Sequence, residues 1–110
     1  MMFRLNPAPT FAATAHISAP GLAQPLALSL TFRHKTAAQA QAWLANAGQS
    51  TDEALLGDVL AGWSGVQDDA GADVPYSPAA LAELLNNYPA AKGEIFRTYL
   101  RELTESKAKN

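Results

Sequence analysis

The sequence predicts an α+β fold, in which an N-terminal antiparallel β-hairpin packs on about four α-helices. Two stretches near the N-terminus alternate apolar and polar residues with period two, which is typical of half-buried strands. After Lys35 the apolar residues recur every three to four positions, as on one face of a helix. A length of 110 residues suits one domain, spanning residues 1–110.

The predicted strands cover residues 11–18 and 26–33. Their apolar positions are Phe11, Ala13, Ala15 and Ile17 in the first strand and Leu26, Leu28, Leu30 and Phe32 in the second. Pro20, Gly21 and Pro25 lie between the two stretches, so a hairpin loop of about seven residues is expected there. Phe3 and Leu5 predict a short third strand before the hairpin.

Two helices are expected in the middle of the chain. Thr36 is a suitable N-cap for the first of them, and Gly48 is a suitable end. Ser50 followed three residues later by Glu53 matches a capping box for the second. One face of that second helix would carry Leu55, Leu56, Val59, Leu60 and Trp63.

Two further helices follow a loop rich in Gly and Asp over residues 64–76. Ser77-Pro78 is a helix start, because a serine cap precedes proline at the first helical position. The sequence Asn86-Asn87-Tyr88-Pro89 ends this helix, and the last helix comes after it. Glu94, Arg97, Arg101, Glu102 and Glu105 are expected on the outside of the last helix, with Lys107 and Lys109 near its C-terminal end.

If each element turns its apolar face inward, these faces meet in one core. The predicted core contains Leu28, Leu30, Phe32, Leu56, Val59, Leu60, Leu81, Leu84, Leu85, Ile95, Phe96 and Tyr99. Replacing Leu84 or Phe96 by alanine is expected to cost on the order of 2–5 kcal/mol of stability.

Composition excludes several classes of function. The chain has no cysteine, so disulfides and thiolate metal sites are impossible, and a reducing cytoplasm is the expected location. The net charge of −2 is too small to predict a nucleic-acid or membrane partner. The N-terminus has no basic region followed by an apolar block, so no signal peptide is expected.

No catalytic or metal-binding constellation emerges from the sequence, and we predict that the protein is not an enzyme and needs no cofactor. His16 and His34 fall on different faces of the hairpin, whereas zinc needs three or four convergent ligands. Residues 68–73 resemble a calcium loop, but alanine occupies the position of the bidentate glutamate. Residues 62–65 resemble part of a nucleophile elbow, but Val66 replaces its last glycine.

Both tryptophans have two interpretations. Trp43 and Trp63 could each pack a helix into the core, which is the commoner role. Alternatively, Trp63, Val66 and Tyr76 border an apolar patch around the long loop and form a partner-binding surface.

Three segments together resemble the small tail assembly chaperones of long, non-contractile-tailed phages and prophages. They run from Met2-Phe3-Arg4-Leu5-Asn6-Pro7 to Leu30-Thr31-Phe32-Arg33-His34-Lys35, then Gly62-Trp63-Ser64-Gly65-Val66, then Tyr76-Ser77-Pro78 with Leu81, Leu84, Leu85 and Asn87-Tyr88-Pro89. The resemblance covers nearly the whole chain, and its motifs are structural rather than catalytic.

This resemblance implies a chaperone that binds the tape-measure protein in the bacterial cytoplasm, helps tail-tube subunits assemble around it, and is absent from the mature virion. It also implies a longer form, made by ribosomal frameshifting near the end of the short frame, that recruits the tail tube protein. The chain given would be the short form, and copies of it could form a homo-oligomer through open strand edges. The alternative is a small cytoplasmic regulatory or toxin-neutralising binding module.

Overall fold

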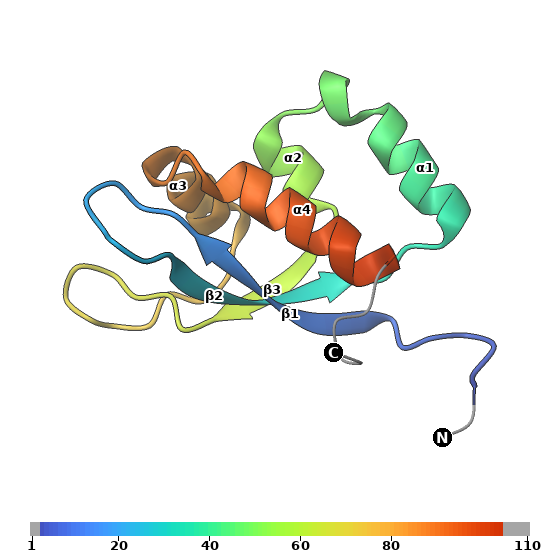
Figure 1. Ribbon diagram of the computed structural model, residues 1–110, viewed down its shortest axis with the longest axis horizontal. Helices are drawn as coiled ribbons and strands as arrows, with labels where there is room; N and C mark the ends of the chain where they lie inside the picture. The colour runs from blue at the N-terminus through green and yellow to red at the C-terminus, as the bar shows by residue number, and fades with distance from the viewer. Residues whose placement is uncertain (1–2, 105–110) are drawn as a thin grey trace.

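The computed structural model describes residues 3–104 and confirms the α+β class. Its elements are β1 (Thr10–Ile17), β2 (Leu26–Arg33), α1 (Ala37–Ala45), the 3-10 turn η1 (Ala47–Gln49), α2 (Asp52–Gly57), β3 (Leu60–Ser64), α3 (Pro78–Asn87) and α4 (Ala91–Thr104). The strands form an antiparallel sheet in the order β1-β2-β3, and the α-helices lie on one side of it (Figure 1).

The predicted hairpin forms as expected. β1 and β2 pair along their whole length, from Thr10 opposite Arg33 to Ile17 opposite Leu26. Ala15 and Leu28, which are directly opposite each other, are both buried under the helices, whereas their neighbour His16 is exposed on the open face. The alternation in the sequence therefore reports which face of the sheet is covered.

The predicted helix over the Leu55 to Trp63 stripe is wrong in its second half. α2 ends at Gly57, and residues Leu60–Ser64 form β3, which pairs with the central strand β2. Glycines at positions 57 and 62 each cost a helix about 1 kcal/mol relative to alanine, which weakens helix propagation through this stretch. The backbone N–H and C=O groups of these residues pair instead with those on the free edge of β2.

A β-bulge explains why the apolar residues of this strand have the spacing that is typical of a helix. Leu60 lies opposite Phe32 and Gly62 lies opposite Thr31, so Ala61 is an extra residue in β3. In a regular strand, Leu60 and Trp63 would point to opposite faces because they are three residues apart. The bulge turns both toward the helices, with Trp63 opposite the buried Leu30, and so produces the spacing that a helix would also produce.

The expected strand at Phe3 and Leu5 is also absent. These side chains are 95% and 90% exposed and precede β1 without pairing to it. Pro7 and Pro9 lack the backbone N–H that a ladder requires. The hairpin is extended only by the N–H of His34, which donates to the carbonyl of Pro9 at 2.9 Å.

Helices α1, α2 and α3 each begin after a residue whose side chain caps the first turn. Thr36 and Gln39 form a reciprocal capping box at the start of α1, which ends at Ala45 rather than at Gly48. The N-cap of α2 is Thr51 rather than Ser50, because the Ser50 hydroxyl instead donates back to the carbonyl of Asn46. Ser77 caps α3 by accepting from the N–H of Ala80, as expected.

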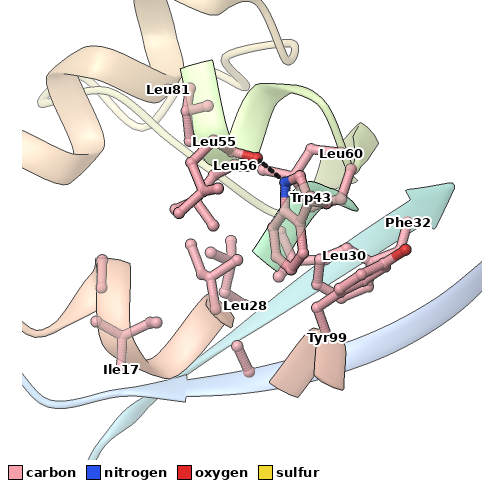
Figure 2. Close-up of a cluster of buried hydrophobic side chains, with 14 residues drawn as sticks. Ile17, Leu28, Leu30, Phe32, Trp43, Leu55, Leu56, Leu60, Leu81 and Tyr99 are labelled. Atoms are coloured by element: carbon pink, nitrogen blue, oxygen red, sulfur yellow. Dashed lines mark hydrogen bonds between the residues drawn. The ribbon is translucent and has the colours of Figure 1, made fainter. Parts of the chain in front are cut away.

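The core is one cluster between the sheet and the helices; nine of the twelve residues predicted for it belong to it, and the other three pack against it. Leu84, Leu85 and Phe96 are only partly buried, whereas the others are buried. Ala15, Ile17, Trp43, Leu55 and Ala91 complete the buried set. Figure 2 shows the Trp43 indole N–H donating to the carbonyl of Leu55 at 3.0 Å, which joins α1 to α2 inside the core.

Of the charged residues predicted for the outside of α4, Arg97 is exposed, whereas Glu94, Arg101 and Glu102 are half-buried. The Arg97 guanidinium pairs with the Glu94 carboxylate at 2.8 Å. The predicted outward position of Glu105 and the predicted roles of Lys107 and Lys109 lie outside the described residues.

Candidate partner-binding site

The structure brings Trp63, Val66 and Tyr76 together at one end of the sheet. The rings of Trp63 and Tyr76 meet edge to face, with centroids 5.1 Å apart, and all three side chains are half-buried. The indole N–H of Trp63 donates to the carbonyl of Val74 at 2.9 Å. This hydrogen bond fixes the segment after β3 against the strand, so Trp63 has a structural role beside any role in binding.

Residues 65–76 form a short hairpin-like arm rather than an open loop. Gln67 pairs with Asp73, and the N–H of Val74 donates to the carbonyl of Val66 at 2.8 Å. One carboxylate oxygen of Asp68 accepts from the N–H groups of Ala70 and Ala72, at 2.9 and 3.0 Å. Asp68 therefore closes the turn of the arm, which gives the acidic segment 68–73 a structural explanation.

A groove runs between the arm and α3. It encloses a volume of about 470 Å³. Its apolar lining comes from Trp63, Val66, Ala70, Val74, Ala80, Leu84 and Tyr88, and its polar lining from Gln67, Asp68, Asp69, Glu83 and Asn87. The arm runs through Ser77 directly into α3, so two consecutive segments of the chain form the two sides of the groove.

A second pocket of about 250 Å³ continues this groove toward the β1–β2 turn. It shares Val66, Gln67, Leu84 and Tyr88 with the first, and it adds Gly65 and the ends of the hairpin strands at Ile17, Leu26, Ala27 and Leu28. Leu26 is 45% exposed at this end, and Leu22 in the turn is 53% exposed. The two pockets together are called the apolar groove below.

The sequence-based site is only part of this groove. Trp63 and Val66 line it, whereas Tyr76 packs on Trp63 and is not among the lining residues. Leu84 was predicted for the core, Leu26 for the apolar face of a strand and Tyr88 for the end of a helix, but all three line the groove. The sequence carries no signal that separates them, because the apolar stripe of α3 predicts burial for Leu84 as much as for Leu81, which is the one fully buried residue of this helix.

The groove holds neutral and acidic groups. Burial raises the pKa of the Tyr76 hydroxyl above its usual value of 10.0, while the Arg33 guanidinium opposes that shift. Tyr76 is therefore a neutral phenol at physiological pH. Asp68, Asp69 and Glu83 are exposed on the groove's border.

The histidines and the serine singled out in the sequence lie apart from one another. His16 is opposite Ala27 at one end of the hairpin, and His34 follows Arg33 at the other. No three His, Asp or Glu side chains in residues 3–104 are grouped so that they could hold a metal ion. Ser64 ends β3 opposite Ser29, and no histidine lines either part of the groove.

Within residues 3–104, no helix combines the length and the apolar character needed to cross a bilayer.

Comparison with known proteins assigns the chain to a family. No curated protein and no solved structure matches the chain. The family model described as phage tail assembly chaperone matches residues 1–110, which is the whole sequence given. The chain therefore belongs to the phage tail assembly chaperone family, whose members are not enzymes.

Proposed function

We propose that this chaperone binds the tape-measure protein of a long, non-contractile phage tail in the host cytoplasm, and that the apolar groove is its binding site. The tape-measure protein is a long chain with much apolar helical surface and no tube around it until assembly. A chaperone for such a chain needs an apolar binding surface rather than reactive groups.

The observation that carries this proposal is the groove itself. Val66, Leu84 and Tyr88 are half-buried in the free chain, and all three line both of its parts. Half-buried apolar and aromatic side chains next to a polar border are the usual composition of a protein interface. The arm that forms one wall is longer than a simple helix connection requires, and such segments are often functional.

Co-expression with the neighbouring tape-measure protein tests the proposal. Val66→Ala and Tyr76→Ala are the test variants, the first in the lining and the second behind Trp63. Leu44→Ala is the matched control, because Leu44 is 41% exposed on α1 and lines neither pocket. An anchor lost from the groove weakens binding by about 2 kcal/mol or more, or about thirtyfold in Kd.

Each variant must first melt cooperatively near the wild-type temperature. Solubility and co-purification of the tape-measure protein are then compared across the variants. If both test variants keep it soluble as well as wild type and Leu44→Ala do, the part of the groove around Trp63 and Val66 is not the binding site. If wild type itself neither keeps it soluble nor co-purifies with it, the tape-measure proposal fails, and another tail protein becomes the expected partner of this chaperone.

We further propose that a frameshift-extended form of this chain recruits the tail tube protein, and that neither form stays in the mature virion. The gene is then expected to carry a slip-prone run of nucleotides near the codons for residues 107–110, which lie outside the described structure. Mass spectrometry of the expressed gene would detect the longer product. Stop codons directly after the overlap in the shifted frame would contradict this.

A further inference from the structure

The border of the apolar groove carries charge of one sign. Asp68, Asp69 and Glu83 line the groove and are exposed, and no Lys or Arg among residues 3–104 lines either of its parts. The ion pairs among residues 3–104 join Lys35 to Asp58, Lys92 to Asp52 and Arg97 to Glu94. None of these pairs includes a carboxylate of the groove, so the border has no internal neutralising partner in this part of the chain.

We propose that the groove selects an amphipathic helix whose apolar stripe is flanked by Lys or Arg residues. This inference rests on the proposed function and specifies the partner segment. The stripe would pack on Val66, Leu84 and Tyr88, while its basic flanks meet the carboxylates of the border. Complementary charge of this kind steers association and selects against acidic partners, because like charges at the border repel.

A helix fits this groove better than an extended strand. The backbone groups of Val66, Asp68 and Val74 that face each other bond within the arm, so they are not available to a partner strand. A strand would bring unpaired N–H and C=O groups to a surface that offers few backbone partners. A helix satisfies its own backbone and presents only side chains, as in helix-in-groove recognition.

Synthetic helical peptides test the proposal without the tape-measure protein. Three peptides share one length: a leucine stripe with lysine flanks, the same stripe with glutamate flanks, and the lysine flanks with a glutamine stripe. The first is expected to bind the chain at least about tenfold more tightly than either of the others at low salt. The difference between the lysine and glutamate peptides should shrink at about 0.5 M salt, where the Debye length falls to a few ångströms.

Two double variants separate the groove from the overall charge. Asp69→Lys with Glu83→Lys reverses the border and leaves Asp68, which closes the turn of the arm, in place. Glu53→Lys with Glu102→Lys changes the net charge equally at residues that line neither part of the groove. The preference for lysine flanks should disappear or invert in the border variant and persist in the distant one.

The proposal is overturned if the peptides with lysine and glutamate flanks bind the wild-type chain with the same Kd. It is also overturned if both double variants lose the preference for lysine flanks to the same extent. Peptide binding and retention of the tape-measure protein are scored separately. If wild type and the border variant retain that protein equally well, the charge inference fails while the proposed function stands. If the peptides behave as expected but the protein is not retained, the proposed function fails and the preference of the groove stands.

Discussion

Tyr99 is the side chain that ties the last helix to the sheet. Its hydroxyl donates to the carbonyl of Arg33 at 2.8 Å, across 66 positions of sequence, and its ring is fully buried. The ring lies 5.0 Å from that of Phe32 and 5.3 Å from that of Trp43. One residue therefore joins α4 to the end of β2 and to α1, three segments far apart in the sequence.

This burial makes stability sensitive to alkaline pH. Burial, and then the Asp58 carboxylate, raise the pKa of Tyr99 from 10.0 to about 12. The folded state therefore favours the neutral phenol. The stabilisation of the folded state that results is fully present below pH 10 and is lost as the pH rises through about 12. The unfolding free energy, measured in urea, should fall over this window.

Tyr99→Phe is expected to reduce that alkaline slope and to cost about 1 kcal/mol at neutral pH, because one hydrogen bond is lost. Burial raises the pKa of Tyr76 as well, so part of the slope should remain in this variant. An identical slope in wild type and Tyr99→Phe would show that Tyr99 is not the group responsible.

Core residues of the same type but different burial should respond differently to truncation. Phe32 and Leu56 are fully buried, whereas Phe96 and Leu84 are partly exposed. Alanine at either buried position should cost about 3–5 kcal/mol, and alanine at Phe96 or Leu84 about 2 kcal/mol, the lower end of the range expected for such truncations. Losses below about 0.5 kcal/mol at both Phe96 and Leu84, measured by urea unfolding, would contradict their packing.

Among the elements, β3 has the greatest influence on the architecture. Its bulge at Ala61 directs Leu60 and Trp63 to the same face, so a five-residue strand contributes to both the core and the groove. Gly65 follows it with a φ of +78°, a conformation that L-residues with a Cβ rarely adopt. This conformation turns the chain from the strand into the arm.

Two glycine substitutions should therefore have opposite effects. Gly65→Ala is expected to destabilise the protein by about 1 kcal/mol through backbone strain alone, since an added Cβ would meet no atom within 4 Å. Gly57→Ala, at the end of α2 and equally free of contacts, should stabilise it by about 0.5 kcal/mol or more through helix propensity. If both substitutions change the unfolding free energy measured in urea in the same direction, this explanation is ruled out.

At the scale of the whole molecule, the helices lie on one side of the sheet, and the groove forms at the end where the arm and the β1–β2 turn project together (Figure 1). Four segments build it: the ends of the hairpin strands, β3, the arm and α3. A groove assembled in this way depends on the fold as a unit, since no single segment contains a complete wall and floor.

The same arrangement predicts that stability is independent of metal. His16 and His34 lie near opposite ends of the hairpin, seven strand positions apart in β2 and so roughly 20 Å from each other. The melting temperature should be the same with and without EDTA. A clear drop on chelation would mean that a metal site had been missed.

The sequence by itself determined the hairpin and its inward face, because period-two alternation is a local property of a strand covered on one side. It also determined the starts at Thr36 and Ser77, where a side-chain oxygen caps the next turn. Most residues of the core were determined as well, because an apolar side chain on the covered face of an element is buried whether that element is a helix or a strand.

The tertiary structure alone decided that residues 60–64 are a strand. Their spacing fits a helix and a bulged strand equally well, and the choice depends on the free edge of β2, which is remote in sequence. It also decided the groove, since whether Leu84 and Tyr88 are covered depends on where the arm and the hairpin end lie. Long-range pairing and incomplete burial are properties of the packed molecule, and no local pattern records them.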